Sequence, residues 1–112
     1  MKQKIKDFIY RMDNVSFAEL TRQIPESAGE RVMFINNDSL IVWSGVSQEF
    51  AEAVEDLLRD GLIRYEAVPL LVYMSDRQVL NGFPERFPLA ERVKRYAKPR
   101  WLPVVLRPNL KR

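Results

Sequence analysis

The sequence predicts a single α+β domain with three helices toward the N-terminus, a β-hairpin inserted between the second and third helices, and a basic, Pro-rich C-terminal segment. Three observations predict this arrangement. Apolar residues recur at helical spacing in three segments before residue 61, and two β-prone runs flank an Asn/Asp turn. After residue 76 prolines become frequent and the charge turns positive. We therefore expect residues 1–76 to form the body of the fold and residues 77–112 to form an extension packed on it.

The first two helices follow from spacing and capping. Apolar side chains at i, i+3, i+4 and i+7 predict a helix over residues 2–12. These side chains are Ile5, Phe8, Ile9 and Met12. Ser16 and Glu19 fit a capping box, in which a hydroxyl and a carboxylate satisfy amide groups at the start of a helix. We expect this second helix to cover residues 17–24, because Pro25 limits its extension.

Two β-prone runs then predict the hairpin. Residues 31–35 and 40–43 are nearly continuous in apolar side chains, and residues 36–39 (Asn-Asn-Asp-Ser) supply the turn. Such runs have no polar side to turn toward solvent. We therefore expect burial on both faces or a contact with another protein.

The third helix is the most clearly delimited element. Ser47 is a suitable N-cap for a helix over residues 48–60, and Gly61 stands where a left-handed C-terminal cap belongs. Its apolar stripe consists of Phe50, Val54, Leu57 and Leu58. Residues 62–67 and 70–74 are then expected to form two strands.

The C-terminal segment predicts one further helix and an extended run. Pro88 suits the first turn of a short helix over residues 88–97, in which Leu89, Val93 and Tyr96 would share a face. These residues are followed by the run Trp-Leu-Pro-Val-Val-Leu, which is too apolar to remain in water. We expect this run to be extended and to pack on the body or on a second copy of the chain.

Two stretches resemble winged helix-turn-helix domains. VSFAEL (residues 15–20) is similar to the entry into the second helix of such domains. AVEDLLRDGLIRYEAVPLLVYM (residues 53–74) is similar to their third helix running through a Gly-Leu-Ile corner into the β wing. The resemblance covers residues 15–24 and 47–74. It implies a winged-helix-like fold with a β wing, and it implies DNA binding and transcription regulation.

The sequence departs from that family in two respects. A typical member joins its second and third helices by a short turn, whereas a hairpin intervenes here. The family's third helix usually reads the DNA major groove, but here it carries five acidic residues against Arg59 alone. These are Glu49, Glu52, Glu55, Asp56 and Asp60. Repulsion between these carboxylates and the phosphates disfavours the usual docking.

Cysteine and histidine are both absent from the chain. Their absence excludes zinc-finger ligand sets, Cys–His nucleophilic pairs and Ser–His–Asp triads. No carboxylate cluster beside a Gly-rich loop points to another metal or acid–base site, so we expect no enzyme activity, no catalytic residues, no metal and no cofactor. Because no run of about 18 apolar residues occurs and no disulfide can form, we expect a cytoplasmic protein without a membrane partner.

The formal net charge of +3 conceals an asymmetry. Residues 1–50 carry a net charge of −1, residues 51–76 carry −4, and residues 77–112 carry +8. Such a basic segment predicts an anionic partner, and nucleic acid, DNA or RNA, is our first hypothesis. Its cations would neutralise phosphates with little sequence specificity, and an interleaved aromatic ring could stack on an unpaired base. The predicted contacts are Arg86, Arg92, Lys94, Arg95, Lys98, Arg100 and Trp101, helped by Lys2, Lys4 and Lys6.

Competing interpretations stay open beside this hypothesis. The basic segment could be a solvated helix face with Tyr96 and Trp101 in the core, or Arg100 could pair with the acidic helix. Alternatively, the chain is a protein-interaction or homodimerisation module with no nucleic-acid binding, using the hairpin 31–43 and the acidic helix. That interface would comprise Val32, Phe34, Ile41, Trp43, Glu49, Glu52 and Asp56. The alternatives to this interface are ordinary core burial of the hairpin and a solvated outer face of the acidic helix. No small-molecule substrate is evident.

Overall fold

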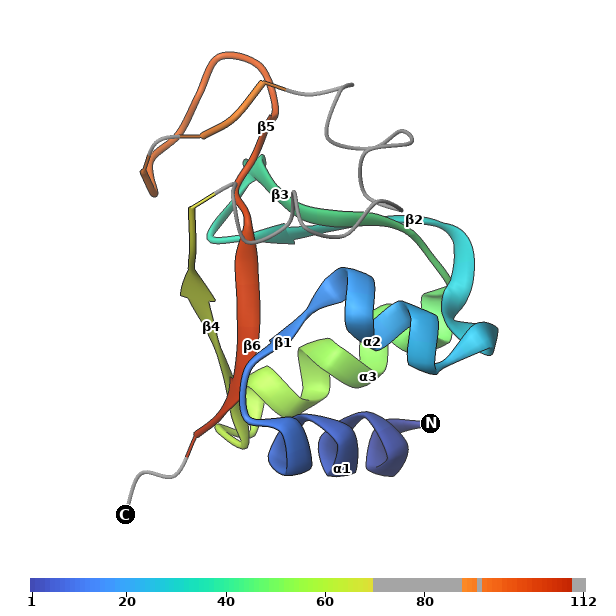
Figure 1. Cartoon of the computed structure of the whole chain (residues 1–112). Helices are drawn as coiled ribbons and strands as arrows, with labels where there is room; N and C mark the ends of the chain where they lie inside the picture. The colour runs from blue at the N-terminus through green and yellow to red at the C-terminus, as the bar shows by residue number, and fades with distance from the viewer. Residues whose placement is uncertain (70–87, 91, 110–112) are drawn as a thin grey trace.

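A computed structural model describes residues 1–69, 88–90 and 92–109 of the chain (Figure 1). The helices are α1 (Lys2–Met12), α2 (Phe17–Gln23), the short 3-10 helix η1 (Pro25–Ser27) and α3 (Gln48–Arg59). The strands are β1 (Val15–Ser16), β2 (Ala28–Ile35), β3 (Asn37–Val46), β4 (Ile63–Ala67), β5 (Arg100–Trp101) and β6 (Val104–Pro108). The longest helix in the described part has 12 residues, and none there is long and apolar enough to span a bilayer.

The three helices form where local signals predicted them. Helix α1 covers residues 2–12 and buries Ile5 and Ile9. The capping box before α2 is also confirmed: the Ser16 hydroxyl accepts a hydrogen bond from the Glu19 amide at 3.0 Å, and the Glu19 carboxylate accepts one from the Ser16 amide at 2.9 Å.

Helix α3 is bounded by the two residues predicted to cap it. The Ser47 hydroxyl accepts a hydrogen bond from the Phe50 amide at 3.1 Å. Gly61 ends the helix in the left-handed region at φ +74°, where its amide donates to the carbonyl of Leu58 at 3.1 Å. The apolar face of α3 is buried against the core through Phe50, Ala51, Ala53, Val54 and Leu57.

The predicted hairpin is present and forms the larger part of one sheet. Strands β2 and β3 pair antiparallel around Asn36, which takes a positive φ of 69°. Strand β5 pairs parallel to the other edge of β3, so β3 lies in the middle in the order β2-β3-β5. This central position explains why residues 40–43 are buried on both faces, as expected from their continuous apolar run.

The second sheet shows that the predicted winged-helix arrangement is wrong. Its order is β1-β6-β4, and strand β6 from the C-terminal end pairs antiparallel with both β1 and β4. The hairpin between α2 and α3 belongs to a different sheet, together with β5. The described residues therefore form a small α+β domain, in which two three-stranded sheets are seen. The predicted second wing strand at 70–74 and the boundary at residue 76 lie outside the described residues.

An aromatic cluster joins α2 to the sheet that contains β3 and β5. Phe17 stacks on Trp43 with ring centroids 6.0 Å apart, and Trp43 packs against Trp101 at 6.5 Å. Trp101 is completely buried, and its indole N–H donates to the carbonyl of Val42 at 3.3 Å. The run that begins at Trp101 is extended and buried against the body, in agreement with the sequence analysis.

The prediction of a short helix over residues 88–97 is wrong. Residues 88–90 and 92–97 are not helical, and Leu89 instead forms a parallel bridge with Trp101. The predicted apolar face does not cover the core either, since Leu89 and Val93 are 37% and 54% exposed. Backbone groups of this segment bond to other strands, which replaces the hydrogen bonds that a helix would supply.

Replacing Gly29 with Ala should destabilise the fold. A Cβ at this position would lie 2.5 Å from Cα of Ser47 and 2.6 Å from the carbonyl oxygen of Val46. Neither backbone atom can move freely, because Ser47 caps α3 and its amide donates to the Ser27 carbonyl at 2.7 Å. We expect unfolding in urea to show a loss of about 1–3 kcal/mol. A loss below about 0.5 kcal/mol would contradict this close contact.

Candidate nucleic-acid interface

The candidate site is a closed surface loop, residues 92–100, which we call the basic loop. Its two ends are joined by backbone hydrogen bonds. The Ala90 amide donates to the carbonyl of Trp101 at 2.8 Å, and the Trp101 amide donates to the carbonyl of Pro88 at 2.9 Å. Because β5 begins at Arg100 and pairs with β3, the loop is fixed at the upper end of the molecule in Figure 1.

The basic loop is also docked on the turn that opens β3. The Tyr96 amide donates to the Ser39 hydroxyl at 2.9 Å, and the Asn37 side-chain amide donates to the Lys94 carbonyl at 3.4 Å. Asn37 in turn accepts a hydrogen bond from the Ser39 amide at 2.8 Å, which fixes the turn itself. The loop backbone therefore has defined partners on two sides.

Tyr96 organises the cations of the loop. Its hydroxyl donates to the Arg92 carbonyl at 3.0 Å and accepts from the Arg92 amide at 3.3 Å. The Lys94 ammonium lies 5.0 Å from the Tyr96 ring centroid, and the Arg100 guanidinium carbon lies 4.7 Å from it. These cation–π contacts gather positive charge around one ring, where the face of an aromatic side chain attracts cations.

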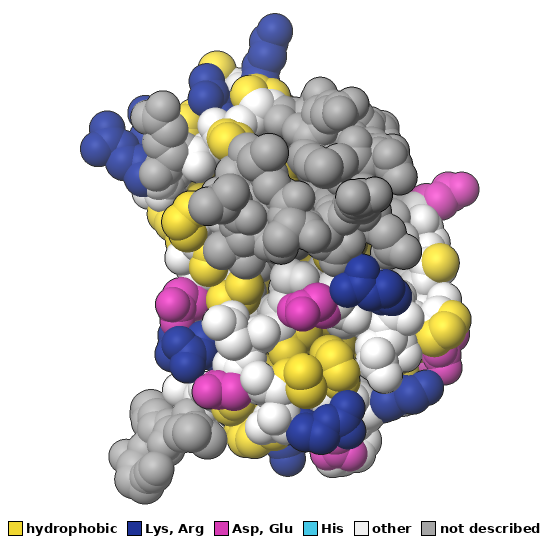
Figure 2. Space-filling model, in the orientation of Figure 1, with side chains coloured by type: hydrophobic (Ala, Val, Ile, Leu, Met, Phe, Trp, Pro, Cys, Tyr) yellow, Lys and Arg dark blue, Asp and Glu magenta, His cyan; other side chains and the backbone are white. Residues whose placement is uncertain are grey.

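The cations of the basic loop are displayed to solvent. Four of them are exposed and Arg100 is half-buried. The exposed ones are Arg92, Lys94, Arg95 and Lys98. Figure 2 shows dark blue side chains gathered at the upper left, where this loop lies. Within the described part of the chain, the ion pair that the loop makes is the one between Arg95 and Asp38, at 2.8 Å.

Cations elsewhere in the described structure are matched more evenly by carboxylates. Ion pairs join Lys2 to Asp60, Lys4 to Glu26, Arg31 to Glu55 and Arg59 to Asp56. Arg107 pairs with both Glu66, at 3.1 Å, and Asp13, at 3.5 Å. Hydrogen bonds from Arg107 and then from Arg64 hold the pKa of the Glu66 carboxyl below its usual range. Among the described residues, the excess of positive charge is thus concentrated in the basic loop.

The other residues predicted to contact nucleic acid are not seen on the exposed surface of the basic loop. Trp101 is fully buried, so its ring cannot stack on a base as predicted. Lys2, Lys4 and Lys6 lie on α1, at the opposite end of the molecule from the loop (Figure 1). Arg86 lies outside the described residues.

The predicted protein interface is divided between core and surface. Ile41 and Trp43 are core residues, so their side chains are not presented to a partner. Val32 is half-buried and Phe34 is 44% exposed on β2. On α3, Glu49 and Glu52 are exposed and Asp56 is half-buried. Glu52 accepts a hydrogen bond from Gln48 at 2.6 Å, and Asp56 pairs with Arg59, so neighbours on the helix engage part of this acidic face.

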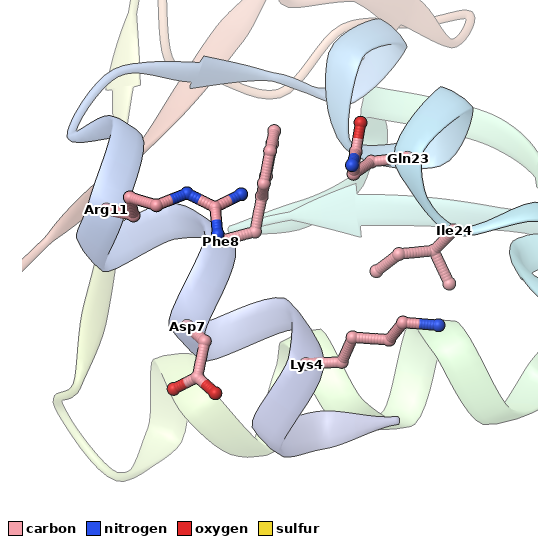
Figure 3. Close-up of a pocket in the computed structure, with 6 residues that line it drawn as sticks. All are labelled: Lys4, Asp7, Phe8, Arg11, Gln23 and Ile24. Atoms are coloured by element: carbon pink, nitrogen blue, oxygen red, sulfur yellow. The ribbon is translucent and has the colours of Figure 1, made fainter.

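A groove between α1 and α2 is a second concave feature (Figure 3). It has a volume of about 290 Å³ and is lined by Lys4, Asp7, Phe8, Arg11, Gln23 and Ile24. The Arg11 guanidinium lies over the Phe8 ring at 5.4 Å, and the Ile24 side chain beneath is fully buried. Every buried side-chain N or O atom of the described residues has a hydrogen-bond partner, so no orphaned buried polar group points to a ligand here. Among all the residues that the structure describes, no group of three or more carboxylates is placed so that it could hold a metal ion.

The turn residues that hold the basic loop were missed by the sequence analysis. Asn37, Asp38 and Ser39 were interpreted only as a hairpin turn, and each contacts a loop residue 57 positions away. No spacing or composition signal connects segments so distant in the chain. In the fold, the parallel pairing of β5 with β3 brings the basic loop beside this turn.

Comparison with models of protein families, with curated proteins and with solved structures finds no match to this chain. The resemblance of residues 15–24 and 47–74 to winged helix-turn-helix domains stays a prediction.

Proposed function

We propose that this protein is a non-enzymatic accessory or regulatory module that binds the phosphate backbone of nucleic acid through the basic loop. One observation carries the proposal: five cations lie within residues 92–100, and a single carboxylate, Asp38, pairs with them among the described residues. Guanidinium and ammonium groups in such a cluster neutralise phosphates and release the counterions condensed on the nucleic acid.

The chemistry of the loop favours duplex over single-stranded nucleic acid. Binding to single strands draws much of its energy from bases stacked on exposed aromatic rings. Here Trp101 is buried, and the ring of Tyr96 is already in contact with Lys94 and Arg100. Cation–phosphate contacts remain, and a duplex presents phosphates at the higher density. Contacts of this kind position a protein without reading the bases, so sequence specificity should be weak.

The acidic helix lies away from the proposed contact surface. Helix α3 runs through the lower half of the molecule in Figure 1, whereas the basic loop is at the top. A duplex on the loop would therefore not have to approach the carboxylates of α3. This geometry supports a docking mode different from major-groove reading by the third helix.

The proposal predicts a steep dependence of duplex binding on salt. We expect the association constant, measured by fluorescence anisotropy with a short labelled duplex, to fall about a hundredfold between about 50 and about 200 mM salt. The fall should be similar for two duplexes of unrelated sequence. A single strand of equal length should bind more weakly and show a shallower slope. Absence of binding at low salt, or binding that salt leaves unchanged, would contradict the proposed function.

A further inference from the structure

The ion pair between Arg95 and Asp38 lies inside the proposed phosphate-binding surface. The Arg95 Nη1 atom lies 2.8 Å from the Asp38 Oδ1 atom, and the two side chains are 68% and 77% exposed. Water screens pairs this exposed, and both ions can be rehydrated or re-paired easily. The ion pair therefore adds little to the stability of the fold, although it engages one of the cations of the basic loop.

Asp38 is held in this position by the residues on both sides of it. The side chain of Asn37 bonds to the Lys94 carbonyl, and the hydroxyl of Ser39 accepts from the Tyr96 amide. Three consecutive turn residues thus contact three consecutive loop residues, with Asp38 opposite Arg95 in the middle. The backbone on each side is fixed, so the carboxylate stays at the loop even when its ion pair opens.

A carboxylate and a phosphodiester present equivalent acceptors to a guanidinium. Each offers two oxygens that can receive parallel N–H donors from arginine. We propose that Asp38 occupies, in the free protein, the place that a nucleic-acid phosphate takes on Arg95, so that binding exchanges an internal carboxylate for a phosphate. This inference rests on the proposed function and makes Asp38 an internal competitor that lowers affinity for anionic partners.

Replacing Asp38 with Asn tests the exchange. Asn keeps the shape of the side chain and removes its charge, so the ionic attraction that holds Arg95 at this position is lost. We expect D38N to bind a short labelled duplex about two- to five-fold more tightly than the unmodified protein at low salt, which is the size of effect that one exposed ion pair supports. The matched control is D7N, because Asp7 is an exposed aspartate on α1, far from the loop, and gives the same change in net charge.

A double-mutant cycle separates displacement from a general charge effect. If Asp38 acts by occupying Arg95, the gain from D38N should largely disappear in the R95Q background. An equal gain in both backgrounds, or a gain no larger than that of D7N, would overturn the inference. The proposed function is judged separately: if the unmodified protein binds duplex with a steep salt dependence while D38N changes nothing, only the exchange at Arg95 is rejected.

Discussion

Replacing Arg92, Lys94, Arg95 and Lys98 together with Gln should weaken duplex binding about a hundredfold at about 50 mM salt and lower the salt slope by about 3 to 4. Each substitution removes one cation that can release a counterion from a phosphate. Gln keeps part of the aliphatic stem and a polar end, so the loop can stay docked through its backbone bonds to Asn37 and Ser39. Fluorescence anisotropy over a range of salt concentrations gives both quantities.

The matched control removes the same amount of charge from α1. Lys2, Lys4, Lys6 and Arg11 are replaced with Gln, so both variants lose four positive charges from the net +3 of the chain. We expect this control to change affinity by less than about tenfold, through the overall field of the protein alone. Equal losses in the two variants would show that net charge governs binding, and the basic loop would lose its assigned role.

Replacing Trp101 with Ala should cost about 3–5 kcal/mol of folding free energy. The indole is fully buried, packs against Trp43 and donates a hydrogen bond to Val42. Its removal leaves a cavity where β5 joins β3 and takes away the hydrogen bond to the Val42 carbonyl. Since small domains have a total stability of about 5–15 kcal/mol, a large part of it should be lost. Urea unfolding followed by circular dichroism measures the change.

A milder variant distinguishes a core role for Trp101 from a role in base stacking. Trp101→Phe should remain folded and lose a smaller part of the stability, because much of the buried apolar surface is kept. Its affinity for single-stranded and duplex nucleic acid should match that of the unmodified protein. Loss of single-strand binding without loss of stability would support the stacking role instead.

The elements that could be predicted are those whose sequence signals lie within a few residues of one another. Helix α1 followed from apolar spacing, and α2 from the reciprocal bonds that Ser16 and Glu19 can make. Ser47 and Gly61 delimited α3 because a hydroxyl and a left-handed glycine satisfy the free backbone groups at helix ends. In each case the physics that decides the structure acts between residues three or four positions apart.

The sheet order could not be predicted, because strand pairing acts between distant segments. Strand β4 was correctly expected, yet its partner in the described structure is β6, which brings Tyr65 opposite Leu106. Nothing in the residues of either strand specifies the other. The helix expected at 88–97 failed for a similar reason, since Ser39 and Trp101 supply hydrogen bonds to this segment from outside it.

The candidate site was predicted in its composition and missed in its geometry. The positive charge of the C-terminal segment can be counted from the sequence, and four of its cations, Arg92, Lys94, Arg95 and Lys98, do lie exposed in one loop. A count of charged residues could not show that Trp101 lies in the core or that Asp38 lies beside Arg95. Nor could it separate the lysines of α1 from the loop, because those positions depend on the assembled fold.

A nuclear magnetic resonance titration of isotope-labelled protein with a short duplex tests most directly whether the basic loop binds nucleic acid. We expect the largest amide shift changes in residues 92–100 and in the turn at residues 37–39, and we expect α3 to change little. Changes concentrated on α3 or on α1, with the basic loop unaffected, would contradict this expectation.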